Sequence, residues 1–202
     1  MTPNEELVAF YYELGMAITH WANVEIELCI TVQSCFTENY HPSLGVGFFA
    51  IENFRSKLEF SDEVVRRRLG EDVEGWADTI AEVRKASFAR NKLVHRSVRA
   101  YLSNTAGRRY ALIPWIIKKP RTDKERLKPP PGSLCVRDII QMRYQFVSAF
   151  ASLRTFRTRA LGRPEQPLKY PEQLQSPPTI PQIRRRIHEV LGHPLKPSRK
   201  KS

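Results

Sequence analysis

Three polar side chains suited to phosphodiester chemistry lie within six residues of one another, in the segment FARNKLVHRSV that covers residues 88–98. They are Arg90, Asn91 and His95. A histidine can take a proton from a ribose 2′-hydroxyl or give one to a leaving oxygen. An arginine can hold a phosphate bidentately and offset the charge that develops on it. An asparagine can orient the imidazole or bind a phosphate oxygen. The segment is therefore a candidate catalytic site, and this chemistry requires no metal ion.

Helix geometry limits how one chain could assemble this site. Asn91 and His95 are four residues apart and share a helix face. Arg90 lies about 140° around the helix from His95. A single straight helix would therefore not direct both side chains at one atom. We expect the last turn of this helix to face its twin across a two-fold axis, so that two copies of each residue converge on one cleft.

A plainer interpretation of the same residues stays open. Basic and polar side chains near the C-terminus of a helix interact favourably with the helix dipole and with its free carbonyl groups. On this interpretation Arg90, Asn91 and His95 only stabilise the end of a helix. Glu25 on the first helix either approaches the cleft and positions Arg90 or has an ordinary surface or capping role.

The elements that would position these residues are helical. Apolar residues at intervals of three and four predict a first helix over residues 4–37, with Asn4 as its N-cap. A second helix is predicted to begin after Ser43 and to reach residue 60, and Ser61 is predicted to cap a further helical piece that ends at Gly70.

The candidate residues fall at the end of a third predicted helix, over residues 72–94. Its apolar series consists of Val73, Trp76, Ile80, Val83, Phe88 and Leu93. On the preceding helices, the phenylalanines are expected to belong to the core rather than to a base-stacking platform: Phe48, Phe49, Phe54 and Phe60.

The pattern changes after residue 95. Two β-prone runs, near residues 98–102 and 110–117, flank the turn-forming segment SNTAGRR and predict a hairpin. A basic, proline-rich loop follows, and a last helix is predicted from residue 133 or 136 to about 161. We expect its exposed face to carry Arg137, Arg143, Arg154, Arg157 and Arg159. The predicted organisation is a helical domain over 1–161, with the hairpin and basic loop at about 96–134, and a Pro-rich basic tail over 162–202 with one short helix.

The string RNKLVH resembles the R-x4-6-H motif of HEPN domains. The surroundings, "WANVEIEL" on a long first helix and "FFAIENFRSKL" on the next, are similar to that family as well. The resemblance spans roughly residues 5–160. It implies an all-α, up-and-down helical bundle, here with a β-hairpin between the third and fourth main helices.

The resemblance also implies a metal-independent endoribonuclease that acts as a homodimer, often in toxin–antitoxin or antiphage-defence systems. Arg90 and His95 would carry catalysis and Asn91 would support it. The products would be a 2′,3′-cyclic phosphate and a 5′-hydroxyl. Some members are inactive scaffolds, so a non-catalytic RNA- or protein-binding module is the alternative.

Charge is distributed unevenly along the chain. Residues 1–60 carry a net charge of −6, residues 61–100 of +2, residues 101–160 of +10 and residues 161–202 of +6, which gives +12 in all. This asymmetry favours an anionic partner for the C-terminal half, and RNA is the expected one. The alternative is that the excess charge only maintains solubility. The residues expected to contact RNA are Lys92, Arg96, Arg99, Lys118, Lys119 and Arg121.

The remaining features point to a cytoplasmic protein. No apolar run approaches the roughly 20 residues that a membrane span needs. The acidic start of the chain does not resemble a secretory signal or a transit peptide. Cys29, Cys35 and Cys135 form no CxxC pair and are expected to be buried thiols. We expect no metal or other cofactor and no membrane. The expected partners are RNA, a second copy and, in a toxin–antitoxin setting, an antitoxin or other protein.

Overall fold

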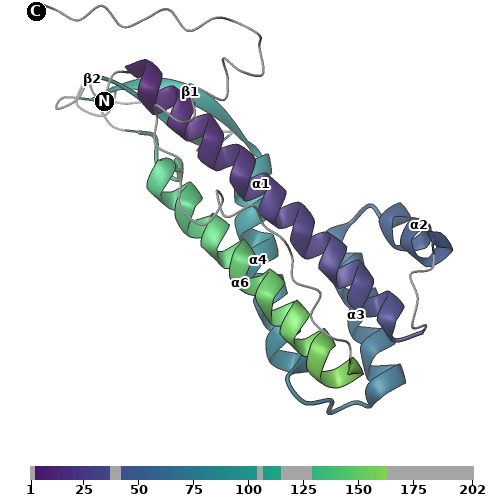
Figure 1. Ribbon diagram of the computed structural model, residues 1–202. Coiled ribbons are helices and arrows are strands. Elements are labelled where there is room, and N and C mark those ends of the chain that lie inside the picture. The colour runs from purple at the N-terminus through teal and green to yellow at the C-terminus, as the bar shows by residue number, and fades with distance from the viewer. Residues whose placement is uncertain (1–2, 37–41, 104–106, 115–128, 163–202) are drawn as a thin grey trace, which may run out of the picture.

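The computed structural model describes residues 3–36, 42–103, 107–114 and 129–162. Within these ranges the chain forms a mostly helical fold with one small β-hairpin (Figure 1). The elements in chain order are α1 (Pro3–Ser34), α2 (Pro42–Ala50), α3 (Phe54–Leu69), α4 (Trp76–Val94), β1 (Arg96–Ser103), β2 (Gly107–Pro114) and α6 (Val136–Leu161). The predicted helical class and the hairpin after the third predicted helix are confirmed. None of the helices in the described ranges is long and apolar enough to cross a membrane.

Helix directions differ from a simple up-and-down order. Ion pairs join Glu13 to Arg143 and Glu27 to Arg157, and in both pairs the arginine lies 130 residues after the glutamate. Because this separation in sequence is the same at both points, α1 and α6 are neighbours that run parallel. The ring of Trp21 lies 4.5 Å from that of Phe54, so α3 starts near the middle of α1. Lys57 then pairs with Glu25, which makes α3 parallel to α1 as well. The predicted strict alternation of helix directions is therefore wrong. The segment containing α2 brings the chain back from the end of α1 to near its middle, where α3 begins and runs in the same direction as α1.

α4 runs antiparallel to its neighbours and ties them together. Near the beginning of α4, Trp76 donates from Nε1 to Asp62 of α3 at 2.8 Å, and its ring lies 4.8 Å from that of Phe156 near the end of α6. Farther along α4, both carboxylate oxygens of Glu82 accept hydrogen bonds from the hydroxyls of Ser148 and Ser152. These contacts fix the beginning of α4 against α3 and α6, and Glu82 against α6.

Three predicted helix starts are wrong. The helix predicted from residue 72 begins at Trp76, and two predicted N-caps fail. Ser61 does not cap a new helix: it is fully buried inside α3, and its hydroxyl donates to the carbonyl oxygen of Lys57 at 2.7 Å. Asn53 is the N-cap instead, since its side chain accepts from the backbone N–H of Arg55 at 2.8 Å. Asn4 lies inside the first turn of α1, which begins at Pro3, a residue whose fixed φ suits that position. The predicted ends of α3 at Gly70 and of α4 at Val94 are confirmed.

Only part of the basic face predicted for α6 is exposed. Arg143 is buried, and its Nε lies 3.1 Å from Glu13 of α1. Arg157 is mostly buried and donates to Glu27 at 2.6 Å. These arginines point inward because the buried carboxylates of Glu13 and Glu27 lie directly opposite them on α1. Arg137 and Arg159 are exposed as predicted, and Arg154 is half-buried.

His20 makes stability depend on pH. Burial lowers its pKa from the ordinary 6.5, and the charge of Arg143 lowers it further. A lowered folded-state pKa means that the neutral imidazole stabilises the fold above pH 6.5, and that this contribution is lost as the pH falls through the folded-state pKa. Urea titrations between about pH 7.5 and pH 5 should show a steeper loss of unfolding free energy in the wild type than in His20→Gln. Identical pH profiles would contradict this.

Glu13, in the same region, shifts in the opposite sense and must be separated from His20. Burial raises the pKa of Glu13, although Arg143 partly offsets the rise. Its contribution to stability is therefore present below the ordinary pKa of 4.5 and lost as the pH rises through the folded-state value. Comparing the wild type with His20→Gln at each pH cancels the Glu13 effect, because both proteins contain it.

The hairpin closes the end of the bundle near the start of α1. β1 and β2 pair antiparallel, with Arg96 opposite Pro114 and Ser103 opposite Gly107. Arg109 on β2 forms an ion pair with Glu6 of α1 at 3.0 Å. Leu112 exchanges two backbone hydrogen bonds of 2.9 Å with Leu134, just before α6. The hairpin is thereby fixed to both α1 and the start of α6 (Figure 1).

Candidate functional site at the end of α4

The end of α4 positions the three candidate residues. The last helical residue is Val94, and the backbone N–H of His95 still bonds to the carbonyl of Asn91 at 3.3 Å. His95 itself has φ −96° and ψ 27°, outside helical geometry. The chain turns into β1 at Arg96. His95 therefore lies where a helix becomes a strand, and its side chain is exposed.

All three candidate side chains line one open pocket of about 630 Å³ within a single chain. One chain therefore brings Arg90 and His95 to the same pocket, which the angular spacing along a straight helix did not predict. Arg90 has a long side chain that bends towards its neighbour, where Nη1 donates to Asn91 Oδ1 at 3.2 Å.

Arg90 retains hydrogen-bonding capacity. Its Nε is buried and has no hydrogen-bond partner among the described residues. A guanidinium carries five N–H donors in a fixed planar arrangement. The bond to Asn91 uses one of them and the buried Nε is out of a ligand's reach, so an anionic ligand would be bound by the remaining Nη hydrogens.

The opposite wall of the pocket comes from the start of α3. Asn53, Phe54 and Leu58 line it, and Phe54 is anchored against the buried ring of Trp21. Arg55 and Glu59 also line it and pair with each other at 2.8 Å. Glu52 adds a second carboxylate. The pocket is therefore of mixed charge, with both acidic and basic groups on the α3 side.

An exposed stripe runs along α4 into the pocket. Arg84, Phe88, Asn91 and His95 recur at intervals of three and four residues, and all are exposed. The prediction that Phe88 belongs to the core series is wrong: its side chain is 63% exposed. Phe88 lies five residues after the buried Val83, a spacing that turns it away from the core. A large exposed ring between an arginine and the candidate catalytic residues is unlike an ordinary solvated helix face.

The residues predicted to bind RNA are not gathered at this pocket. Lys92 and Arg99 are exposed, but neither lines it. Arg96 is partly consumed internally, because Nη1 donates to the carbonyl of Lys92 and Nε donates to that of Gly132 at 3.2 Å. Lys118, Lys119 and Arg121 lie outside the described residues. Sequence reasoning missed two cations that line the pocket, Arg55 and Arg84. The spacing of Arg84 from Asn91 and His95 could have revealed it.

Glu25 does not position Arg90. Its Oε1 lies 3.3 Å from Nζ of Lys57, and both side chains are largely buried. The ammonium of Lys57 also lies 5.1 Å from the centroid of the Phe49 ring and 5.5 Å from that of Phe48. Of the phenylalanines assigned to the core, Phe48 is buried, Phe54 packs against the core, and Phe49 and Phe60 are 50% and 40% exposed.

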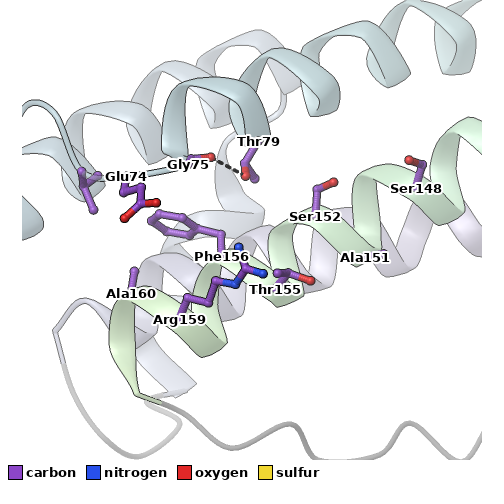
Figure 2. A pocket seen from close by; sticks show the side chains of 11 residues that line it. Glu74, Gly75, Thr79, Ser148, Ala151, Ser152, Thr155, Phe156, Arg159 and Ala160 are labelled. Carbon is purple, nitrogen blue, oxygen red and sulfur yellow. Dashed lines mark hydrogen bonds between the residues drawn. The ribbon is translucent and has the colours of Figure 1, made fainter.

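A second pocket, of about 450 Å³, lies between the start of α4 and the end of α6 (Figure 2). Ser148, Ser152, Thr155 and Arg159 line it from α6, and Thr79 lines it from α4. The Thr79 hydroxyl already donates to the carbonyl of Gly75 at 2.7 Å. Ser148 and Ser152 donate to Glu82. Because these hydroxyls have internal partners and no histidine or cysteine lines the pocket, we assign no chemistry to it.

The cysteines and acidic residues suggest no further centre. All three cysteines are free thiols, but only Cys29 is buried as predicted; Cys35 is half-buried and Cys135 is exposed. Burial raises the pKa of Cys35 to about 11, so it is a protonated thiol at neutral pH. Among the described residues, no group of three or more His, Cys, Asp or Glu side chains could hold a metal ion.

Comparison of the chain with known protein families, curated proteins and solved structures finds no match. A functional assignment must therefore come from the chemistry of the pocket at the end of α4.

Proposed function

We propose that the chain is a metal-independent endoribonuclease of HEPN type, with a toxin or antiphage-defence role. One observation carries the proposal: Arg90, Asn91 and His95 line a single open pocket, in which Asn91 holds the Arg90 guanidinium. The pairing of an accessible imidazole with a fixed guanidinium suits transfer of a phosphoryl group between two hydroxyls of RNA.

The proposed reaction assigns a role to each group. His95 takes the proton from a ribose 2′-hydroxyl, and the 2′-oxygen forms a bond to the adjacent phosphorus. The bond from phosphorus to the 5′-oxygen breaks, and that oxygen receives a proton. The products are a 2′,3′-cyclic phosphate and a 5′-hydroxyl. Arg90 donates to the phosphate oxygens as charge develops on them, and Asn91 holds the guanidinium in place.

The second proton transfer needs another group. A carboxylate has no proton to give, so in a site completed within one chain the roles are exchanged: Glu52, which lines the same pocket, would take the proton from the 2′-hydroxyl and a protonated His95 would give one to the 5′-oxygen. The alternative is His95 of a second copy, as a site shared across a homodimer would require. Both versions need Arg90 and His95, and they differ in whether two inactive variants can complement each other.

The direct test is incubation of the purified full chain with single-stranded RNA in EDTA. We expect cleavage with cyclic-phosphate ends, and its loss in Arg90→Ala and His95→Ala. Uncut RNA at every protein concentration would overturn the proposal.

A non-catalytic RNA- or protein-binding module is the second candidate. Its protein-binding version is favoured by the carboxylates of Glu52 and Glu59 on the pocket wall, which oppose a dense polyanion. Salt-sensitive RNA binding without cleavage would support an RNA-binding module. Absence of RNA binding at about 50 mM salt would favour a protein partner, such as an antitoxin, instead.

Phe88 offers a test of RNA contact that does not depend on catalysis. Stacking of a base on an exposed aromatic ring contributes about 1–3 kcal/mol per base. We therefore expect Phe88→Ala to weaken binding of single-stranded RNA about 5- to 150-fold, as measured by fluorescence anisotropy with the His95→Ala background preventing cleavage. Phe60→Ala is the matched control, because Phe60 is exposed on α3 but does not line the pocket. Equal affinity of both variants would contradict a stacking role.

A further inference from the structure

α1 has an unusual distribution of polar and apolar residues. Its exposed residues from Glu6 onwards are Tyr11, Gly15, Ile18, Thr19, Ala22 and Ile26, and none carries a charge. Tyr11, Ile18 and Ile26 are 52%, 49% and 47% exposed. The carboxylates of Glu13 and Glu27 on the same helix are buried against α6. The charged side chains therefore face the core, and apolar ones face outwards.

We name Tyr11, Gly15, Ile18, Ala22 and Ile26 the α1 outer face. These residues follow one another at intervals of four, three, four and four, so they form one continuous stripe. It points away from the buried series that includes Phe10, Ala17, Val24 and Leu28. Even Thr19 beside the stripe has its hydroxyl satisfied, because it donates to the carbonyl of Gly15 at 2.9 Å.

The other long helices do not share this feature. The exposed residues of α3, α4 and α6 include charged side chains such as Arg67, Lys85 and Arg137. A helix that is apolar on its outer side as well as its inner side is normally covered on both. Nothing in the described part of the chain covers the α1 outer face, which leaves this face available to a partner.

We infer that this face binds a second copy of the chain, with the two α1 helices antiparallel about a two-fold axis. In the register centred between residues 16 and 17, Gly15 faces the other copy's Ile18, and Tyr11 faces its Ala22. Each contact places a large side chain on a small one and occurs twice by symmetry. The same surface thus supplies the large side chains and the small residues against which they pack, as an isologous interface requires.

The chemistry of the face argues against other partners. RNA needs cations, and the exposed residues of this face include none. The C-terminal region 163–202 contains the strongly basic run RRR at 184–186, and an uncharged surface offers that run no counter-charge. A second copy needs no charge complementarity. The two faces bring equal, neutral and complementary surfaces together, despite the net charge of +12 on each chain.

The size of the face sets the expected strength. The stripe extends over sixteen residues of helix, or about 22 Å from Tyr11 to Ile26. A contact between two helices of this length is small beside the 1,200–2,000 Å² typical of stable interfaces. We therefore expect a dimer that dissociates on dilution in the micromolar range, rather than a permanent one. This inference goes beyond the proposed function and does not depend on it.

Sedimentation velocity of the full chain over roughly 1–300 µM tests the inference. We expect the wild type to shift from monomer to dimer, Ile18→Glu to remain monomeric, and Tyr144→Glu to dimerise like the wild type. Tyr144 is the matched control because it is 62% exposed on α6, outside the α1 outer face. A wild type that stays monomeric throughout would overturn the inference, as would a dimer that survives Ile18→Glu.

Gly15 provides a second variant that cannot fail through misfolding alone. A Cβ atom placed at Gly15 meets nothing within 4 Å, so a larger side chain fits the single chain. Replacing a mid-helix glycine also favours the helix. We expect Gly15→Leu to keep or raise the thermal midpoint of the monomer and to weaken the dimer at least tenfold, because leucine would occupy the space proposed for Ile18 of the other copy. Undiminished dimerisation of Gly15→Leu would overturn the proposed register.

Discussion

Replacing His95 with alanine should lower the rate of RNA cleavage by a factor of about 10² to 10⁴, the usual contribution of a group that transfers a proton in the transition state. RNA affinity should change far less, because an exposed neutral imidazole adds little to phosphate binding. Arg90→Ala should cause a loss of at least about 10² through the charge that it no longer offsets. Single-turnover cleavage of a fluorescent RNA in EDTA measures both effects separately from binding.

Lys85→Ala is the matched control for these variants. Lys85 is exposed on α4 and does not line the pocket. The Lys85→Ala protein should cleave RNA at a rate within a few-fold of the wild type. If Lys85→Ala and His95→Ala lose the same activity, or if neither loses any, His95 is not a catalytic residue. In that case, the plainer interpretation holds, in which Arg90, Asn91 and His95 only stabilise the end of a helix.

Mixing the Arg90→Ala and His95→Ala proteins distinguishes the two versions of the site. A site shared between copies would place one intact Arg90 and one intact His95 in the same cleft of a mixed dimer, and part of the activity should return. A site completed in each chain by Glu52 should show no recovery. In that case Glu52→Gln should itself lower cleavage and alter its pH profile.

The sequence predicted the helical elements better than their relative directions. α6 and the ends of α3 and α4 follow from apolar spacing and from Gly70, which are local signals. The start of α3 was missed because Ser61 has the side chain of an N-cap, yet its hydroxyl bonds backwards to Lys57 inside a continuous helix. The return of the chain between α1 and α3 has no local signal, since it depends on where Phe54 packs against Trp21.

The sequence predicted three residues that line one pocket, but not the geometry of that pocket. Arg90 and His95 lie about 140° apart on an ideal helix, yet both line it. The α3 wall could not be foreseen, because it depends on long-range packing. The exposure of Phe88 could have been suspected from its spacing to Val83, which does not match the buried face of the helix.

The uneven charge along the chain has an internal explanation that sequence reasoning missed. Glu6, Glu13 and Glu27 of α1 pair with Arg109, Arg143 and Arg157 of the C-terminal half. The glutamates lie at multiples of seven residues, and Arg143 and Arg157 are fourteen apart, so a signal was present in the sequence. Part of the positive charge in residues 101–160 therefore balances α1, and the case for an anionic partner rests on the exposed remainder.

The buried pair of Glu13 and Arg143 should be the most sensitive point of the fold. Both residues are more than 90% buried, with exposures of 5% and 7%, and the two charges lie 3.1 Å apart between α1 and α6. Removing one partner leaves the other as an uncompensated buried charge. We therefore expect Arg143→Met to lower the free energy of unfolding by about 3–5 kcal/mol, as measured by urea titration. Arg55→Met in the exposed pair with Glu59 should cost less than about 1 kcal/mol.

The double variant Glu13→Leu/Arg143→Met distinguishes an electrostatic cost from a packing cost. Replacing both members of a buried ion pair with apolar residues of similar volume is often neutral or stabilising, because the desolvation penalty disappears together with the attraction. The double variant should therefore recover most of the stability that Arg143→Met loses. If the two substitutions instead add, the loss comes from the shape of the arginine side chain against α1, and the heptad spacing of the acidic residues reflects packing rather than charge.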